Sequence, residues 1–567
     1  MKERSKNQKE GERGYKAKIT LMTVILMVFT TSSLVFGLSL SSSQSQSLPF
    51  SMPSKLLGSA SVFASSQEPE FPLRYNEEVG NPVFNLPGFT SEVVAEGLAL
   101  PTTMAFLSLN DILVLEKDKG TVMRIIDGVV QPQPLLDVNV ATEVERCMCG
   151  IAVSQNNETA KTNVFLYYTE ADASGAALGN RVYRYELQEG TPGSAGSLVN
   201  PVLLLDLPAD PGPRHNGGII KIGSDGNLYI TIGDVDKVES ETEAQNEPDV
   251  PADGTGGILR ITQDGEPVID PNTGDYILES DYPVNLYYAY GIRNSFGIDF
   301  DPVSGYLWDS ENGPGHSDEI NRVEPGFNSG WNQIMGIYTR GGGDPREGAA
   351  TVASEQGEGL VNFDGRGHYH PPQLTWLYTV GPTAIKFLNS GNYGVNYENE
   401  MFVGDVHSGN MYHFKLNQDR TELVLEPPLD DKIADTDGES VSDSVLFATG
   451  FGGISDIEVS PYDGYMYVVS LGQGKIFKIL PTGEVPPPSL PTAVPPPPAP
   501  IPAPPAPPVV EEEVPEQEEE EELDDEDEDQ EQDEDDNSDG GGDNGDGDDD
   551  NGDGGGDNGD GDDDGGN

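Results

Sequence analysis

The chain has 567 residues, which leaves room for a core domain of several hundred residues with appendages at its ends. Its 98 acidic residues against 31 lysine and arginine residues give a formal net charge of −67 at pH 7. Because the phosphates of nucleic acids are bound by clustered cations, this balance argues against DNA or RNA as a partner.

The first 40 residues have the pattern of an export signal. Basic residues are frequent in 1–18, and an uncharged, largely apolar run follows at 19–38. Such a run directs export, and about 20 apolar residues also suffice to span a membrane. Residues 1–40 are therefore interpreted as a signal peptide or a membrane anchor. Either one predicts an extracytoplasmic protein, secreted or anchored to the outer face of the membrane. Residues 41–84 are rich in serine and are expected to form a linker.

From 85 to 481, short β-rich runs alternate with turns that contain glycine, proline, asparagine and aspartate. A pair of such runs recurs six times, and no long amphipathic helix is evident. A unit that cannot bury both faces alone has to stack on its neighbours, so the pattern predicts an all-β, six-bladed β-propeller. A β-sandwich is the alternative, but it does not explain the sixfold recurrence. The pairs are 111–116 with 120–125, 164–169 with 181–185, 228–233 with 257–261, 305–310 with 318–323, 400–405 with 409–414, and 464–469 with 474–479.

The C-terminal part of the chain has a composition that cannot form a core. Residues 482–510 are rich in proline and predict a stiff, extended linker. Residues 511–567 are dominated by aspartate, glutamate and glycine and contain no lysine or arginine. Because like charges without apolar partners favour an unfolded chain, this tail is expected to be disordered.

The two cysteines of the chain, Cys147 and Cys149, are separated by a single methionine. One closely spaced pair cannot make a disulfide framework. A bridge across one residue is also expected to be strained. The sequence therefore predicts two small, buried thiols at the entry of a strand.

A histidine and an aspartate flank a predicted hairpin near the middle of the repeated region. The hairpin consists of two short strands, 218–222 and 227–232, joined by a tight turn. Since antiparallel strands bring the two ends of a hairpin together, His215 and Asp234 are expected to lie at the same end. An imidazole beside a carboxylate is the minimum for a general base. The alternative is a histidine in a surface loop and an aspartate that only closes a turn.

Two further stretches carry groups suited to oxygen-rich ligands. Arg293 and Asn294 are adjacent and offer a set of hydrogen-bond donors to neighbouring oxygen atoms. A turn at Gly313-Pro314 would expose carbonyl oxygens, which hard cations such as calcium accept. Each stretch alone is weak evidence, because an Arg-Asn pair is often structural and a Gly-Pro turn is often only a turn.

Taken together in this order, the stretches 145–152, 214–234, 289–297 and 310–319 resemble the soluble PQQ-dependent glucose/sorbosone dehydrogenase family, also called aldose sugar dehydrogenases. The resemblance covers about 85–481. It implies a six-bladed propeller that holds pyrroloquinoline quinone (PQQ) over calcium. It also implies that the anomeric hydroxyl of an aldose sugar is oxidised to a lactone by hydride transfer to PQQ, and that an external electron acceptor reoxidises the quinol.

The resemblance also assigns roles to individual residues. His215 matches the catalytic base, and Asp234 matches the carboxylate that supports it. Arg293, assigned to catalysis as well as to cofactor binding, and Asn294 match the pair that contacts the quinone oxygens. The other implied cofactor contacts are Glu145, Asn312 and Lys386, and the implied calcium ligands are Gly313 and Pro314 through their carbonyls, with Asp318 and Glu319 at a second calcium position found in some members.

The sequence departs from the family in two places. Glycine and leucine are usual where Cys147 and Cys149 stand. Some members place arginines of the fifth blade against the cofactor carboxylates, whereas the loop 405–410 contains none, so Lys386 or Arg340 is the expected substitute. The missing arginines favour an alternative function, a non-catalytic extracellular propeller that acts as a binding module and has lost the cofactor.

Overall fold

The computed structural model describes residues 80–483, apart from 157–160, 192–193, 238–240, 272, 349 and 436–443. The predicted signal or anchor at 1–40, the linkers at 41–84 and 482–510 except for their inner ends, and the acidic tail at 511–567 lie outside these residues. The described part is all-β, and its helices are short 3₁₀ turns. None of these helices is long and apolar enough to cross a membrane. They are η1 (Glu243–Gln245), η2 (Val284–Leu286), η3 (Pro345–Glu347) and η4 (Gly391–Tyr393).

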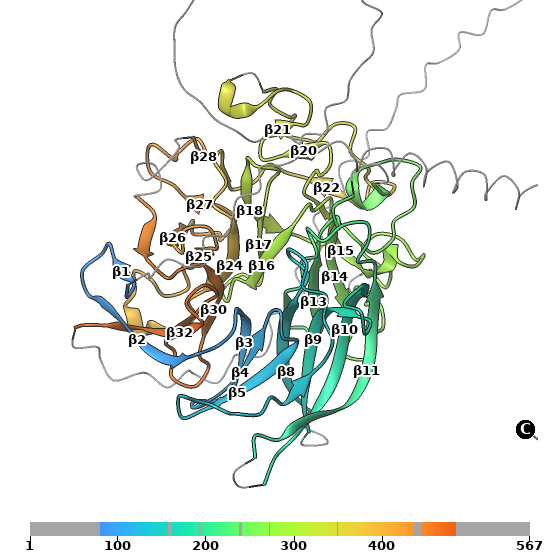
Figure 1. Cartoon of the computed structure of the whole chain (residues 1–567). Coiled ribbons are helices and arrows are strands. Elements are labelled where there is room, and N and C mark those ends of the chain that lie inside the picture. The colour runs from blue at the N-terminus through green and yellow to red at the C-terminus, as the bar shows by residue number, and fades with distance from the viewer. Residues whose placement is uncertain are drawn as a thin grey trace, which may run out of the picture.

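The first three sheets follow one another along the chain (Figure 1). Their strands are mostly antiparallel, because short turns connect consecutive strands. The first sheet contains β3 (Pro101–Ser108), β4 (Asp111–Glu116), β5 (Thr121–Ile126), β6 (Val129–Val130) and β7 (Leu136–Asp137). The second contains β8 (Met148–Asn156), β9 (Lys161–Ala171), β10 (Ala177–Gln188) and β11 (Ser197–Leu207). The third contains β12 (Ile220–Ile222), β13 (Leu228–Ile232), β14 (Gly257–Ile261), β15 (Tyr287–Tyr290), β19 (Phe327–Asn328) and β22 (His368–Tyr369).

Three further large sheets complete the described part, together with a small hairpin of β20 (Ile334–Met335) and β21 (Tyr338–Thr339). The fourth sheet contains β16 (Ser295–Phe300), β17 (Leu307–Glu311), β18 (Asp318–Val323), β23 (Leu374–Trp376) and β28 (Ile433–Ala434). The fifth contains β24 (Pro382–Phe387), β25 (Met401–Asp405), β26 (Met411–Leu416), β27 (Leu423–Val424), β29 (Leu446–Thr449) and β1 (Val83–Phe84). The sixth contains β30 (Ile454–Val459), β31 (Met466–Ser470), β32 (Lys475–Pro481) and β2 (Phe89–Glu96).

The repeated pairs found in the sequence are confirmed as paired strands. Each pair forms two antiparallel neighbours in a sheet of its own: β4 with β5, β9 with β10, β13 with β14, β17 with β18, β25 with β26, and β31 with β32. Their strong apolar patterns reflect burial on both faces, as in β13 and β31, where every residue is buried. The repeat therefore marks the middle of each large sheet.

The sheets are arranged like the blades of a propeller. The first strands of neighbouring sheets contact one another in the series β3–β8–β12, and again in the series β16–β24–β30. The two series meet where β13 contacts β16, and β30 contacts β3, which closes the ring. In Figure 1 the blue first sheet accordingly lies beside the orange last sheet.

An N-terminal strand joins the two ends of the ring. β2 pairs antiparallel with β32, the last strand of the described residues, over most of its length. β1, which falls at the end of the predicted linker 41–84, pairs with β29. A buried apolar cluster packs between the first and last sheets and includes Ala95, Val114, Val469 and Ile476. The ends of the folded region thus hold each other through both hydrogen bonds and apolar contact.

Replacing Ala95 with aspartate tests this closure. Ala95 is only 3% exposed in β2, so the new carboxylate would be buried without a partner. We expect the substitution to lower the free energy of unfolding by about 3 kcal/mol or more. Val93→Asp in the same strand is the matched control, because Val93 is 42% exposed, and its expected cost is about 1 kcal/mol or less. If the two variants melted at the same temperature, β2 would not contribute to the stability of the closed ring.

Candidate active site

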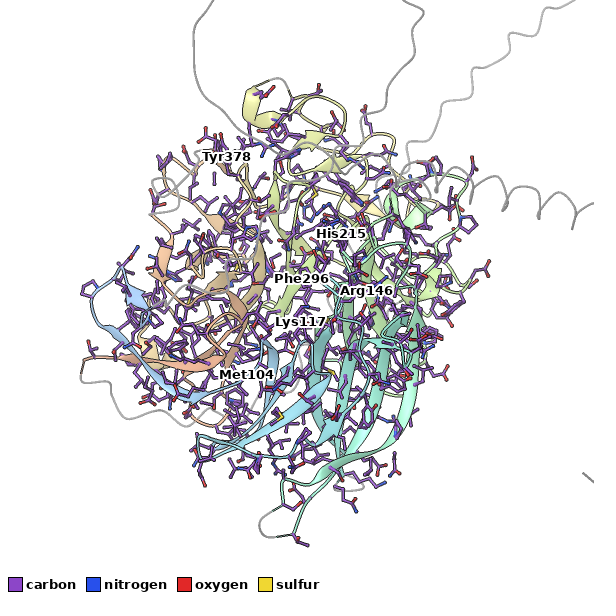
Figure 2. All side chains as sticks on the ribbon, viewed as in Figure 1. Met104, Lys117, Arg146, His215, Phe296 and Tyr378 are labelled. Carbon is purple, nitrogen blue, oxygen red and sulfur yellow. A yellow bond between two sulfur atoms is a disulfide. The ribbon has the colours of Figure 1, made fainter. Side chains whose placement is uncertain are left out.

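A cavity of about 710 Å³ opens where the first strands of the sheets begin. Every large sheet contributes a lining residue at or next to that end of its first strand. Lys117, His215 and Phe296 line this cavity, and Figure 2 shows them near the middle of the molecule. The six residues from the strand starts are Thr102, Cys149, Ile219, Phe296, Thr383 and Ser455.

His215 and Asp234 meet at the cavity end of the β12–β13 hairpin, as the sequence predicted. His215 Nδ1 lies 2.6 Å from Asp234 Oδ1, and His215 lines the cavity. Burial alone would raise the pKa of Asp234, but the charge and the hydrogen bond of His215 lower it below its ordinary value. Because Nδ1 is held by the carboxylate, Nε2 is the ring nitrogen left to exchange a proton with a bound molecule.

Asp234 has a second buried partner that the sequence did not indicate. Trp331 Nε1 donates to Asp234 Oδ2 at 2.8 Å. The backbone N–H of Asp236 donates to the other oxygen at 2.9 Å. Trp331 follows β19, far along the chain, so no local pattern linked it to the hairpin. These bonds fix the carboxylate and through it the imidazole ring.

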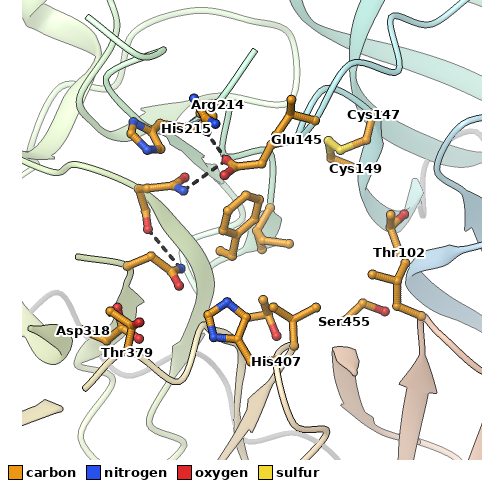
Figure 3. Close-up of a pocket in the computed structure, with 18 of the residues that line it drawn as sticks. Thr102, Glu145, Cys147, Cys149, Arg214, His215, Asp318, Thr379, His407 and Ser455 are labelled. Atoms are coloured by element: carbon orange, nitrogen blue, oxygen red, sulfur yellow. Dashed lines mark hydrogen bonds between the residues drawn. A yellow bond between two sulfur atoms is a disulfide. The ribbon is translucent and has the colours of Figure 1, made fainter. Parts of the chain in front are cut away.

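Glu145, which lies beside His215 in Figure 3, connects this histidine to Asn294. Its Oε2 accepts two hydrogen bonds, one from the backbone N–H of His215 at 2.6 Å and one from Nδ2 of Asn294 at 3.1 Å. His215 has a φ of +57°, a left-handed conformation that residues other than glycine rarely adopt. The carboxylate of Glu145 therefore helps to hold the backbone of His215 in this conformation.

Arg293 and Asn294 are held by the last residue of β17 and the loop that follows it. The backbone N–H of Arg293 donates to Glu311 Oε1 at 2.6 Å, and its Nη1 donates to the carbonyl of Asn312 at 2.8 Å. The guanidinium also lies over the ring of Trp331, 5.3 Å from its centroid. Arg293, Asn294 and Asn312 all line the cavity.

The loop 313–318 is folded around one carboxylate. Asp318 Oδ1 accepts the backbone N–H of Gly313 at 2.9 Å, and Oδ2 accepts those of Val380 and Gly381 at 2.7 and 2.8 Å. Burial raises the pKa of Asp318, and these hydrogen bonds oppose the rise. Gly313 and Asp318 line the cavity, whereas Pro314 is not among the lining residues.

Asp318 and Glu319 lie on opposite faces of β18. Neighbouring residues of a strand point to opposite faces of the sheet, and Glu319 is paired in register with Glu311 of β17. Burial, and then the charge of Glu311, raises the pKa of Glu319 well above its ordinary value. Among the described residues, no group of three or more His, Cys, Asp or Glu side chains is placed to hold a metal ion.

Lys386, an expected cofactor contact, lies elsewhere. Its Nζ is 3.1 Å from Asp299 Oδ1 and 3.0 Å from Glu458 Oε2, in a buried ion-pair cluster that also includes Lys221. Lys386 does not line the cavity, and neither does Arg340, which lies over Trp331. The position of Lys386 inside β24, rather than at its beginning, turns its side chain away from the cavity end.

The basic side chains that line the cavity besides His215 are Lys117, Arg214, Arg293 and His407. The sequence offered a signal for two of them. Lys117 follows β4 directly, and His407 lies two residues after β25, just as Asn312 follows β17. The ends of these second strands lie beside the starts of the first strands, so the residues after them reach the same end of the ring.

The two cysteines form a disulfide, so the prediction of two thiols is wrong. Both residues are buried, as expected, but they also line the cavity. The register between β8 and β9 shifts between Met148 and Gly150. This β-bulge at Cys149 brings the two Cα atoms to 5.1 Å, which is within the range of disulfides. In a regular strand the two Cα atoms would lie about 6.6 Å apart.

Comparison with known proteins identifies relatives of this chain. A family model described as Glucose / Sorbosone dehydrogenase matches residues 98–478. An aldose sugar dehydrogenase of Escherichia coli is 25% identical over 272 residues, which cover 47% of this chain and 60% of that protein. A quinoprotein glucose dehydrogenase B of Acinetobacter calcoaceticus is 26% identical over 268 residues, which cover 44% of this chain and 53% of that protein. The chain thus matches less than two thirds of the length of either relative.

A solved structure shares the fold. The crystal structure of the soluble aldose sugar dehydrogenase of Escherichia coli in its apo-form aligns with 69% of this chain and 99% of its own chain, with a TM-score of 0.52. Its sequence identity to this chain is 21%. At that identity the likeness concerns the fold alone.

Proposed function

Because the chain belongs to the glucose/sorbosone dehydrogenase family, we propose that it oxidises the anomeric hydroxyl of an aldose sugar to a lactone, with PQQ and calcium bound in the cavity. The observation that carries the proposal is His215, held by a buried Asp234, in one cavity with Arg293 and Asn294. The names of two relatives, an aldose sugar dehydrogenase and a quinoprotein glucose dehydrogenase, support sugar oxidation.

The residues around the cavity fit an anionic cofactor. Lys117, Arg214 and Arg293 bring positive charge to the lining of an otherwise strongly acidic protein. The two lining carboxylates, Glu145 and Asp318, are both occupied by N–H donors of the protein. An anion with several carboxylates, such as PQQ, is therefore attracted by the cations and weakly repelled by the acids. In this proposal these cations take the place of the fifth-blade arginines.

One buried polar atom at the cavity lacks a partner within the described residues. Asn294 is 2% exposed, and its Oδ1 has no hydrogen bond. A buried acceptor without a donor costs about 1–3 kcal/mol. A hydroxyl or ring N–H of a bound molecule would satisfy it. The unpaired Oδ1 is therefore evidence for a ligand bound at Asn294. In an empty cavity the free-energy cost of this buried acceptor would not be compensated.

The proposed chemistry divides the work among the side chains. Nε2 of His215 accepts the proton of the anomeric hydroxyl, because Nδ1 is already bonded to Asp234. Asp234 keeps the ring oriented and stabilises the imidazolium that forms. When bound, PQQ supplies the acceptor for the hydride that leaves the anomeric carbon. The guanidinium of Arg293 stabilises the negative charge on the quinone oxygen of the bound cofactor.

We propose that the enzyme is a six-bladed propeller and that it is exported from the cytoplasm. We count each of the six large sheets as one blade, with the β20–β21 hairpin as an insertion. The disulfide supports export, because such bonds persist mainly outside the cytoplasm. We propose that the N-terminal segment 1–40 is removed or anchors the protein to the membrane. An external electron acceptor then completes the turnover.

Calcium and PQQ should bind cooperatively. The carbonyls of Gly313 and Pro314 are neutral and would bind calcium weakly, so the cofactor has to complete the coordination. We expect calcium alone to stabilise the protein by about 1 kcal/mol or less, and calcium with PQQ, each near 100 times its dissociation constant, by about 2.7 kcal/mol or more. Each should tighten the other by the same factor. Thermal melts in the four combinations of calcium and PQQ measure both effects.

The control for this experiment is a chain shortened after residue 483, because the acidic tail could itself bind calcium. If calcium stabilises the shortened chain equally with and without PQQ, no cofactor site exists at Gly313-Pro314. The alternative of a non-catalytic propeller that serves as a binding module would then be the better account.

A further inference from the structure

The Cys147–Cys149 disulfide lies in the wall of the cavity (Figure 3), and we propose that it is a redox-controlled positioning element for His215. The inference rests on the proposed function, since it concerns the base of that same site. The oxidised protein is the state with the base in place. Reduction by a small dithiol that enters the cavity lowers turnover, and reoxidation restores it.

The exchange is balanced in atoms and electrons. One sulfur of the dithiol attacks the disulfide, and the second displaces the first from the mixed disulfide. The dithiol leaves as its own cyclic disulfide. Its two electrons and two protons remain on Cys147 and Cys149, which become thiols. The lining position of both cysteines gives a small reductant access to them, although each residue is at most 4% exposed.

The disulfide locks a local geometry that the strand does not enforce by itself. Cys149 is the extra residue of a bulge in β8. Residues two apart in a regular strand are separated by about 6.6 Å, whereas the Cα atoms of Cys147 and Cys149 are 5.1 Å apart. Without the bond, the bulge can open toward regular strand geometry, which would displace the segment before it.

That segment carries the carboxylate that holds the base. Glu145 lies two residues before Cys147, and its Oε2 accepts the N–H of His215 at 2.6 Å. His215 needs this support because its φ is +57°. A shift of Glu145 therefore changes the backbone conformation of His215 and the direction of its ring.

A second contact leads from the disulfide to the same histidine. Cys149 packs directly on Gly218, where an added Cβ would lie 2.6 Å from Cys149 Cβ. Gly218 follows His215 by three residues and begins the approach to β12. Opening the disulfide thus removes support from both sides of His215, through Glu145 before it in the chain and through Gly218 after it.

The effect should remain local, because the backbone around the disulfide has other partners. Met148 N–H donates to the carbonyl of Lys117 at 3.0 Å, and Thr169 N–H donates to that of Cys147 at 3.0 Å. The hydroxyls of Thr102 and Thr103 donate to the carbonyls of Met148 and Cys149 at 2.8 and 2.9 Å. These bonds hold the segment in the sheet when the disulfide is open.

The test compares oxidised protein, reduced protein and the double variant Cys147→Ser/Cys149→Ser. Because dithiols also react with quinones, the apoprotein is reduced, freed of reductant and only then loaded with PQQ and calcium. We expect kcat to fall about 10-fold on reduction, with KM nearly unchanged and full recovery after reoxidation. The double variant should match the reduced protein and should not respond to dithiol. Mass spectrometry with alkylation measures the fraction reduced.

A second readout does not depend on activity. Diethyl pyrocarbonate modifies imidazole nitrogens, and we expect the rate at His215 to change several-fold on reduction, while the rate at His368, outside the cavity, stays constant. If complete reduction leaves both turnover and the His215 rate unchanged, the proposal is overturned. If loaded wild-type protein oxidises no sugar, the proposed function fails, and the His215 rate still decides the positioning role. A loss of cooperative melting in the double variant and the reduced protein alike would assign the bond to stability instead.

Discussion

Replacing His215 with glutamine is expected to lower sugar-dependent dye reduction by about 10²–10⁴-fold, the usual contribution of a general base. Glutamine has a similar size and can still donate a hydrogen bond to Asp234, but it cannot accept a proton at neutral pH. The binding of PQQ should stay within a few-fold of wild type, because the cations at the cavity are untouched. Steady-state kinetics with a dye acceptor and a quinone-absorbance titration measure the two effects separately.

The matched control is His368→Gln, a histidine outside the cavity. It should retain nearly full turnover. A His215→Gln variant with near-normal turnover would contradict the role of His215 as base. A variant that has lost both turnover and PQQ binding would show instead that His215 is a cofactor contact.

Replacing Asp234 with asparagine is expected to reduce kcat by about 10²-fold or more, since removing the carboxylate of a catalytic dyad can cost up to about 10⁴-fold. The amide keeps the volume of the side chain, but it carries no charge to stabilise the imidazolium. Its oxygen can still accept the bond from Trp331, so the local packing should remain. KM and PQQ binding are expected to change little, because Asp234 does not line the cavity.

Asp225→Asn provides the control for this variant, because Asp225 lies in the turn at the opposite end of the same hairpin. It should leave kcat unchanged. If Asp234→Asn had the same turnover as Asp225→Asn, the carboxylate would serve only to close the turn, which was the alternative for this hairpin.

The strand pairs and the His215–Asp234 contact were predictable because local pattern determines both. Alternating apolar residues specify a buried strand pair, and the geometry of a hairpin brings its ends together. The family was also predictable, since its motifs lie in short continuous stretches such as 214–234. Pairing between distant segments was not predictable in this way, and β2 with β32 is the clearest example.

Three expectations about the site differ from the structure for related reasons. Asp318 and Glu319 are neighbours in sequence, but the alternation of a strand places them on opposite faces. The disulfide was not expected because a bridge across one residue is strained in general, and a bulge, which has no clear sequence signature, brings the two Cα atoms to 5.1 Å. Lys386 was chosen for its charge alone, and buried carboxylates of other sheets engage it instead.

The most direct measurement of the central claim is a single-turnover absorbance experiment. Purified protein is loaded with PQQ and calcium, excess cofactor is removed, and aldose sugars are added without an electron acceptor. We predict that the absorbance of the bound quinone disappears with one equivalent of sugar oxidised per protein, and that His215→Gln slows this step by the same factor as the steady state. Stable binding of PQQ with no spectral change for any aldose would contradict the account.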